Sequence, residues 1–365
     1  MPHLFKPIAF GPLQLDNRII IAPMCMYSAE NGIVQPWHWQ HYGNLSQSGA
    51  GLLIVEASAV APEGRITHAD VGIWNIHCQD SLGKLLQDIR RDSNMPAIVQ
   101  IGHAGRKASC SRPWQGGTQL PPSDINGWNT LAPSAIPFAS SDVAPREITK
   151  PEIHDLVHQF VAAAQRVRAA GFDGVEIHAA HGYLLHQFLS PISNHRQDEF
   201  GGSLENRMRL LLTVFDAIKE TLPHDFMVGV RISATDWIEG GWDIEQSLEL
   251  AQLLDSRGCH YLHVSSGGLS PAQQIPVGPD YQVPLAQAIK AKVSMPVIAV
   301  GLITEPEQAE AILENGQADA VALARGILYN PRWPWHAAAA LGAEVKSAPQ
   351  YLRCQPHGLK SLLRS

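Results

Sequence analysis

The chain has 365 residues, 45% of them hydrophobic and 17% charged, which is ample for a sizeable core in one large domain or two ordinary ones. Its 27 Lys and Arg against 34 Asp and Glu give a net charge of −7, so nothing in the balance points to nucleic acid or an anionic membrane. The five scattered cysteines form no CxxC pair, and no leader pattern or run of ~18 apolar residues occurs, so we expect a reduced, soluble, cytoplasmic protein.

Short apolar segments bounded by turn residues recur along the chain, and we interpret them as strands. In chain order they are Ile19–Met24, Gly51–Ala57, Ala97–His103, Gly174–His178, Met227–Ile232, Tyr261–Ser265, Val297–Gly301 and Ala320–Arg325. Helical patterns lie between them, at Trp37–Ser48, Asp80–Arg91, Lys150–Ala170, Ser203–Leu222, Ile244–Arg257, Leu285–Val293 and Pro306–Asn315.

The repeated β-α alternation predicts an α/β fold, in which a parallel sheet closes into one (β/α)8 TIM barrel spanning residues 1–365. A doubly wound open sheet is the competing architecture, because periodicity alone does not show closure. That fold would normally carry a glycine-rich dinucleotide fingerprint after its first strand, and none follows Met24.

One connection is much longer than the others. Residues 105–146, between the third and fourth predicted strands, are rich in Pro, Gly, Ser and Trp. A loop of this length is usually functional, so we predict a lid over the barrel mouth, with Trp114 and Trp128 shaping the choice of substrate. The residues from about 340 to 365 are predicted to form a C-terminal tail.

The run Asp173–Leu184 carries the strongest candidates for catalysis. An alternating apolar strand leads directly into His178, His181 and Tyr183. Two imidazole N–H groups can polarise one oxygen, and a phenol beside them can give up a proton. Because the histidines are three residues apart, a continuing strand would point them to opposite faces, so we expect a turn at Ala179–Ala180.

Other predicted strand ends carry groups suited to a planar, phosphorylated ligand. The amide of Gln100 could bond the edge of a heterocycle, and Arg231 could place positive charge against an anionic ring. For Arg231, a structural ion pair with Glu176 on the neighbouring strand is the alternative. Glycines near the last three strands, with Arg325 closing the eighth, suit a phosphate group.

A metal-dependent hydrolase on the same barrel is a rival interpretation. Glu176, His178 and His181 are potential metal ligands. However, the first strand ends at Pro23-Met24 and lacks the HxH pair usual in such enzymes, and no other strand end completes a ligand set. A non-enzymatic scaffold is a third option, but it leaves the polar residues at the strand ends unexplained.

Six ordered motifs resemble those of the old yellow enzymes, the flavin-dependent ene-reductases. The likeness is greatest to the bacterial subgroup of YqjM-type NADPH dehydrogenases and xenobiotic reductases, and it runs from about Leu4 to about Arg353. The motifs are Ala22–Tyr27, Val55–Ala57, Gly64–Thr67, His103–Lys107, His178–Tyr183 and Ser193–Arg196, and Asp198–Arg207 continues the last. Larger dienoyl-CoA reductases add an iron–sulfur cluster, for which no ligand set is expected here.

The resemblance implies a barrel that holds FMN, accepts hydride from NADPH and passes it to an activated alkene. It implies that the flavin is held by Pro23, Met24, Cys25, Ala57, Gln100, Arg231, Gly301, Ala324 and Arg325. It implies that His178 and His181 bind the substrate carbonyl, that Tyr183 is the proton donor, and that Tyr27 and Arg353 also contact substrate. No metal site is implied.

The resemblance further implies a homodimer or homotetramer in which Arg353 reaches a neighbouring subunit's site; a solvated tail charge is the alternative. Two residues depart from the family pattern, because Ala324 replaces a glycine before the phosphate arginine and Phe200 replaces a tyrosine. Neither the physiological alkene nor the preference for NADPH over NADH can be assigned to a residue from the sequence.

Overall fold

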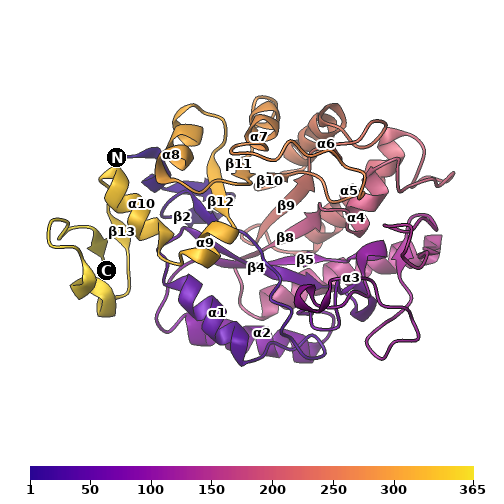
Figure 1. The fold of residues 1–365 in the computed structure, drawn as a ribbon, viewed down its shortest axis with the longest axis horizontal. Coiled ribbons are helices and arrows are strands. Elements are labelled where there is room, and N and C mark those ends of the chain that lie inside the picture. Colours follow the sequence, from indigo (N-terminus) through magenta and orange to yellow (C-terminus); the bar gives the residue numbers. More distant parts are fainter.

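The computed structural model describes residues 1–365 and contains eight parallel strands closed into a barrel (Figure 1). The strands are β3 (Ile19–Ile21), β4 (Leu52–Ala59), β5 (Ala97–Gly102), β8 (Gly174–Ala179), β9 (Met227–Ser233), β10 (Leu262–Ser265), β11 (Val297–Val300) and β12 (Ala320–Leu323). They pair in chain order, and β12 closes onto β3. The predicted (β/α)8 barrel is confirmed, and the open-sheet alternative is wrong.

Helices follow the strands and surround the barrel. All seven predicted helical patterns form: α1 (Pro36–Ser46), α2 (Ile76–Ile89), α3 (Lys150–Ala169), α5 (Leu204–Thr221), α6 (Ile244–Ser256), α7 (Val283–Lys290) and α8 (Pro306–Glu314). Three further helices were not predicted: α4 (Leu184–Leu189), α9 (Arg325–Tyr329) and α10 (Trp333–Leu341). Helix α3 begins with a capping box between Thr149 and Glu152, which satisfies two of the free N–H groups at its start.

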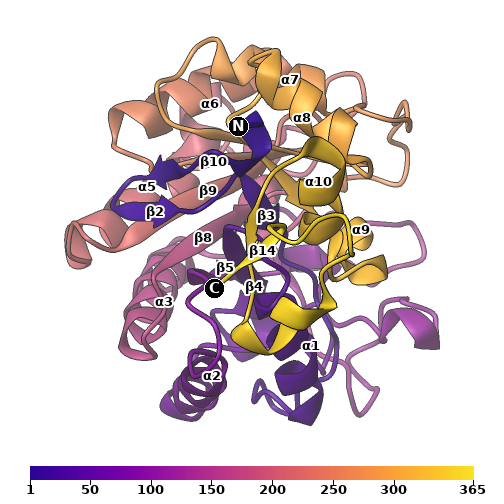
Figure 2. The same cartoon turned by 90° about the vertical axis from the view of Figure 1, so that its left-hand side faces the viewer.

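A hairpin closes the bottom of the barrel, where the strands begin. It consists of β1 (Ile8–Phe10) and β2 (Leu13–Leu15), and Phe10 stacks on Tyr261 inside the barrel at a ring-centroid distance of 5.1 Å. Figure 2 looks onto this end and shows the indigo hairpin in front of the strands. Because this end is filled by side chains, only the ends where the strands finish are left to form a site.

The lid, residues 105–146, lies at the opposite end of the barrel from the C-terminal tail (Figure 1). Two short strands brace its far part, β6 (Leu131–Ala132) and β7 (Arg146–Glu147). Arg106 ties it to the mouth, since its guanidinium donates to the carbonyls of Ile136 and Leu269. The tail contains β13 (Val345–Lys346), a 3-10 turn (Pro349–Cys354) and β14 (Leu363–Arg364).

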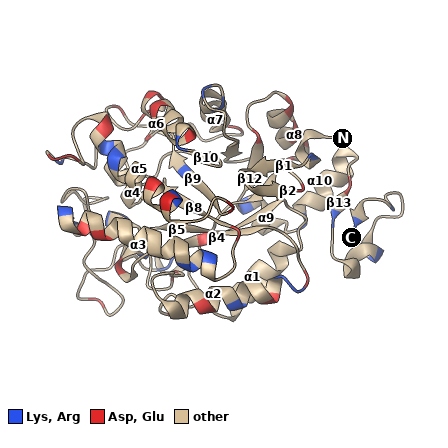
Figure 3. Cartoon of the chain, turned by 180° about the vertical axis from the view of Figure 1, so that it is seen from behind, with Lys and Arg blue, Asp and Glu red and all other residues tan.

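Charged side chains lie on the outer faces of the helices, with both signs interspersed on α2 and α3 (Figure 3). A mixed surface of this kind has no large field of one sign that would attract a polyanion. None of the helices is both long enough and apolar enough to cross a membrane.

Candidate active site

The end of β8 brings His178, His181 and Tyr183 together. The imidazole centroids lie 5.1 Å apart at 89°, and the Tyr183 ring lies 4.9 Å from that of His178. The predicted position of the turn is wrong, because β8 continues through Ala179 and the left-handed residues are His181 (φ 57°) and Gly182 (φ 74°). A Cβ at Gly182 would lie 2.2 Å from the carbonyl oxygen of Gly268, so only glycine fits the turn.

Both histidines are neutral at neutral pH, because burial lowers their pKa values well below 6.5. The Nδ1 atom of His178 accepts the Ala180 N–H at 3.2 Å, which leaves its proton on Nε2. The Nε2 atom of His181 lies 2.8 Å from the Ser265 hydroxyl. If that hydroxyl donates to Nε2, the His181 proton resides on Nδ1, and the pair offers two N–H donors.

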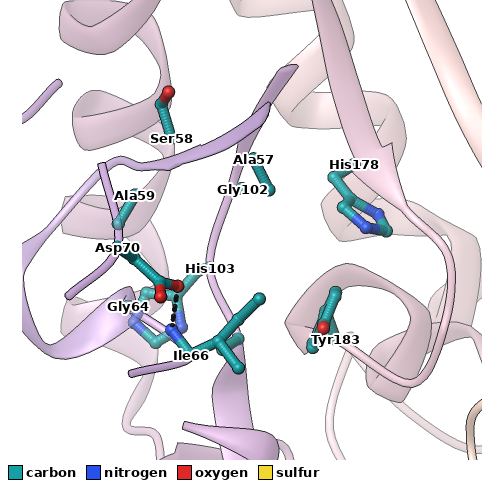
Figure 4. Close-up of a pocket in the computed structure, with 11 residues that line it drawn as sticks. Ala57, Ser58, Ala59, Gly64, Ile66, Asp70, Gly102, His103, His178 and Tyr183 are labelled. Atoms are coloured by element: carbon teal, nitrogen blue, oxygen red, sulfur yellow. Dashed lines mark hydrogen bonds between the residues drawn. The ribbon is translucent and has the colours of Figure 1, made fainter. Parts of the chain in front are cut away.

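The phenol of Tyr183 is protonated throughout the physiological range, because burial raises its pKa well above 10. Figure 4 shows Tyr183 and His178 facing Ile66, Asp70 and His103 across a cavity. Asp70 is held in that opposite wall by the Ile66 N–H and the Thr67 hydroxyl, both at 2.7 Å. The cavity therefore places a proton donor and a hydrogen-bond donor along one side.

A buried carboxylate orients Gln100. Glu176 on β8 is fully buried and accepts hydrogen bonds from Gln100 Nε2 (2.7 Å), Tyr261 Oη (3.0 Å) and His263 Nδ1 (2.9 Å). A carboxylate only accepts, so the amide group that faces it must be the NH2 of Gln100. The carbonyl oxygen of Gln100 is therefore left as an acceptor for another ligand.

Arg231 on β9 does not form the ion pair with Glu176 that was the structural alternative, since the three partners of Glu176 are those just described. In the barrel register Arg231 lies between His178 on β8 and His263 on β10. Its side chain is 7% exposed and its Nε atom has no hydrogen-bond partner. A buried guanidinium left unpaired in this way is suited to an anionic ligand.

The segment after β3 places Pro23, Met24 and Cys25 at the mouth. Met26 fixes the segment, because its N–H donates to Glu56 Oε2 at 2.9 Å. Burial raises the pKa of Cys25, so its side chain is a thiol and not a thiolate.

Two further predicted residues flank this segment. Ala57 on β4 lines the cavity beside His178. Tyr27 adopts φ 49° and packs edge-on against the lid residue Trp114, with the ring centroids 6.1 Å apart. The segment that carries the predicted flavin contacts therefore also reaches the lid.

The proposed phosphate residues lie on neighbouring strand ends, because β11 pairs with β12. Gly301 follows β11 with φ 114°, and a Cβ there would lie 2.2 Å from Gln282 Nε2. Ala324 caps α9, and Arg325 begins that helix with an exposed side chain. The methyl group of Ala324 therefore sits at the start of a formed helix, despite the departure from glycine at this position.

Arg353 does not join this group. It is exposed on the C-terminal tail, at the end of the barrel opposite the lid (Figure 1). The other departure from the family pattern, Phe200, is buried edge-on against Phe188, which is consistent with a packing role.

Lys107 is a residue whose place at the site was not predicted. Its ammonium group donates to the carbonyls of His181 and Gly268, each at 2.9 Å, and lies 5.3 Å from the Tyr183 ring centre. Burial lowers the pKa of Lys107 to about 8. The His103–Lys107 motif was the available signal, but nothing in the sequence shows that this lysine clamps the turn after β8.

The metal-hydrolase interpretation is not supported. The carboxylate of Glu176 is already bonded to Gln100, Tyr261 and His263, and no group of three or more His, Cys, Asp and Glu side chains is placed to hold a metal ion. The residues present instead fit FMN, because an unpaired guanidinium and an amide oxygen suit the flavin ring, and a glycine-lined edge with Arg325 suits its phosphate.

Comparison with known proteins agrees with this site. The sequence matches the NADH:flavin oxidoreductase / NADH oxidase family over residues 3–344. An NADPH dehydrogenase of Bacillus subtilis (strain 168) is 41% identical over 96% of this chain and 98% of its own length. An NADH:flavin oxidoreductase of Gibberella zeae is 43% identical over 95% of this chain and 88% of its own length.

Solved structures show the same barrel. Morphinone reductase superposes with a TM-score of 0.77 at 28% identity, over 100% of this chain and 94% of that one. 2-Naphthoyl-CoA reductase superposes with a TM-score of 0.83 at 26% identity over 93% of this chain. This chain spans only 52%, about half, of that enzyme's length. With a family match over most of its length and relatives above 40% identity, the chain belongs to the NADH:flavin oxidoreductase / NADH oxidase family of flavin-dependent oxidoreductases.

Proposed function

We propose that the chain is an FMN-dependent ene-reductase that uses NADPH to reduce the C=C bond of α,β-unsaturated carbonyls and related activated alkenes or nitro compounds. The observation that carries the proposal is the cluster of two neutral imidazoles and one protonated phenol beside the unpaired Arg231. The names of the Geobacillus and Bacillus relatives support NADPH as the reductant.

The roles of the residues follow from their protonation states. When bound, FMN supplies the hydride that adds to the β-carbon of the alkene. That addition builds negative charge on the carbonyl oxygen, and the two imidazoles of His178 and His181, which lie side by side, stabilise it by hydrogen bonding. Tyr183 gives its hydroxyl proton to the α-carbon, and its raised pKa keeps that proton available.

The remaining predicted residues complete the proposed site. Pro23, Met24, Cys25 and Ala57 line the flavin, and Tyr27 contacts the substrate from the lid side. Gln100 would accept from the N–H edge of bound flavin, and Arg231 would place a positive charge beside its ring. The phosphate is held by the Gly301 turn, the Ala324 end of α9 and Arg325.

An anaerobic absorbance titration of the purified protein tests this function. NADPH should bleach the flavin band, and 2-cyclohexenone added afterwards should restore it. Bleaching without recovery would remove this enone from the substrates, and the absence of a flavin band after reconstitution with FMN would refute the proposal. The double variant His178→Ala, His181→Ala should keep the flavin and lose the recovery step.

A further inference from the structure

A second cavity, of about 630 Å³, adjoins the barrel mouth. The loop after β4 separates the two cavities, because Gly64 and Ile66 line the site with His178, whereas Glu63 and Arg65 line the second cavity. The lid forms its outer wall. Its volume lies within the range of about 300–1,000 Å³ that is usual for small-molecule and cofactor sites.

Arg65 is held rigidly in the wall of this cavity. Its Nε donates to the Pro62 carbonyl at 2.7 Å and its Nη1 donates to the His68 carbonyl at 3.1 Å. Its guanidinium lies 5.5 Å from the centre of Trp74 and 5.0 Å from that of Trp128. Two indole faces and two carbonyls fix the direction of a cation in advance, which reduces the entropic cost of binding an anion.

Arg112, from the lid, is the second cation. Its guanidinium lies 6.0 Å from the centre of the Trp114 ring, and its buried Nε atom has no hydrogen-bond partner. His68 also leaves its Nδ1 atom buried and without a partner. No ion pair in the chain includes Arg65 or Arg112. The unsatisfied Nε–H donor of Arg112 indicates a ligand with acceptor oxygens, and His68 adds a second polar atom that lacks a partner.

The cavity also contains acceptors, since Glu30 and Glu63 line it and Asp124 raises the pKa of His68 from nearby, against the larger lowering by burial. An inorganic anion would offer no hydrogen-bond donors to these carboxylates and would gain nothing from the indole of Trp128. A nucleotide matches both features, because it combines phosphate oxygens with ribose hydroxyls, amino hydrogens and a planar base. The mixed lining therefore favours a nucleotide over a simple anion.

A row of side chains connects this cavity with the first site. Arg112 packs on Trp114, and Trp114 packs on Tyr27 at 6.1 Å between ring centres. Tyr27 stands at the mouth, on the segment that follows β3. A ligand with one end at the flavin site can therefore pass over Tyr27 and Trp114 into the second cavity.

We propose that this cavity binds the phosphorylated adenosine end of the dinucleotide reductant, and that Arg112, with Arg65, selects NADPH over NADH by contacting the 2′-phosphate. The inference rests on the proposed function, since it assigns a binding position to the reductant. If this inference holds, the lid contacts both the reductant and the substrate.

The test compares Arg112→Gln with Arg91→Gln in the holoenzyme, because Arg91 is an exposed arginine just beyond the end of α2 that does not line the second cavity. Arg112→Gln should raise the KM for NADPH and the Kd for adenosine 2′,5′-bisphosphate by about 10-fold or more, which corresponds to one charge-assisted hydrogen bond. The KM for NADH and that for the enone should change little, and Arg91→Gln should behave as the wild type.

Adenosine 2′,5′-bisphosphate contains no nicotinamide, so its binding by calorimetry does not depend on redox chemistry. If it fails to compete with NADPH, if inorganic phosphate competes equally well, or if Arg112→Gln weakens NADPH and NADH equally, the assignment is wrong. If the wild type binds the bisphosphate through Arg112 but shows no bleaching with NADPH, the cavity assignment stands and the proposed function fails.

Discussion

Tyr183 is a buried phenol whose raised pKa suits an acid that must not ionise before it is needed. Tyr183→Phe removes the proton donor and keeps the ring against His178, so enone reduction should slow by at least about 100-fold. Flavin reduction by NADPH should change little, because that step needs no proton from Tyr183. Stopped-flow traces of the two half-reactions check this, with the exposed Tyr329→Phe as control. Equal slowing of both would mean that Tyr183 is not the acid.

Glu56 is a buried carboxyl beneath the segment after β3, and burial raises its pKa from 4.5 to about 8. The folded protein therefore binds a proton that the unfolded chain releases between pH 4.5 and pH 8. Its contribution to stability is greatest at low pH and falls as pH rises through this window, by at most about 1.4 kcal/mol per pH unit. Glu56→Gln is neutral at every pH and should lose less stability than the wild type from pH 5 to pH 8.

Thermal midpoints of the two proteins at pH 5, 6, 7 and 8 check this prediction. The exposed Glu205→Gln should run parallel to the wild type across the series. The other buried carboxyl groups, including Asp70, are common to all three proteins and cancel in the comparison. A Glu56→Gln curve that also ran parallel to the wild type would show that Glu56 does not titrate in this window.

At the level of elements, alternation and turn residues were sufficient to predict the eight strands, their order and the barrel. The helices α4 and α9 were missed because they are short and begin just after a strand end, where Tyr183 and Arg325 were interpreted as site residues alone. Helix α10 was missed because it follows α9 and not a strand, so the alternation of strands and helices does not indicate it. The turn after β8 was predicted at Ala179–Ala180 because these side chains are small. Its actual position is set by the close approach of Gly182 to Gly268. These two glycines are far apart in the sequence, so no local sequence pattern predicts their contact.

The same limit applies to the side-chain contacts of the site. The sequence predicts that the strand ends meet, but it does not predict the partner of Glu176, because β5, β9 and β10 all contribute candidate donors. From the sequence, an ion pair between Glu176 and Arg231 was possible. In the structure, Glu176 instead accepts hydrogen bonds from Gln100, Tyr261 and His263. Which of several nearby donors a carboxylate accepts depends on rotamers, which periodicity does not determine.

Glu176 joins three strands of the barrel and accepts a hydrogen bond from Gln100, the residue proposed to bond the flavin edge. Glu176→Gln keeps the volume, removes the charge that offsets Arg231, and should favour the anionic reduced flavin. The flavin midpoint potential should rise by about 30 mV or more, equivalent to about 1.4 kcal/mol for two electrons. FMN should also bind more weakly, because a glutamine offers only one acceptor oxygen, for which Gln100 would compete with Tyr261 and His263.

Spectroelectrochemistry and an FMN binding titration measure these two effects. Asp236→Asn is the matched control, because Asp236 is also a fully buried carboxylate paired with a histidine, His186 at 2.9 Å. A variant that lost only thermal stability, with its potential and FMN affinity unchanged, would make Glu176 purely structural.

At the scale of the whole molecule, Arg353 is placed where it cannot serve its own site. The tail is fixed by the β13–β14 pairing and by Tyr351, which packs against Trp335 at the end opposite the lid. In a two-fold symmetric dimer, a residue that lies far from its own subunit's site can reach the site of the partner subunit. By symmetry, the same residue of the partner then reaches the site of the first subunit. We therefore expect Arg353→Ala to raise the KM for the enone and to leave the bound flavin unchanged, whereas the exposed Arg364→Ala should have no effect.

Mixed oligomers separate this arrangement from a solvated tail charge. Co-expression of Arg353→Ala chains with Tyr183→Phe chains, carrying different tags, yields mixed dimers that can be purified. If Arg353 acts in the neighbouring subunit, the one site of each mixed dimer that has Tyr183 also has an intact Arg353, so the KM for the enone should return to the wild-type value at about half the wild-type turnover. If Arg353 only carries a solvated charge, the mixed dimer should show no gain in enone affinity over the Arg353→Ala homodimer. A single-subunit mass in solution would refute the arrangement outright, because the tail would then have no second site to reach.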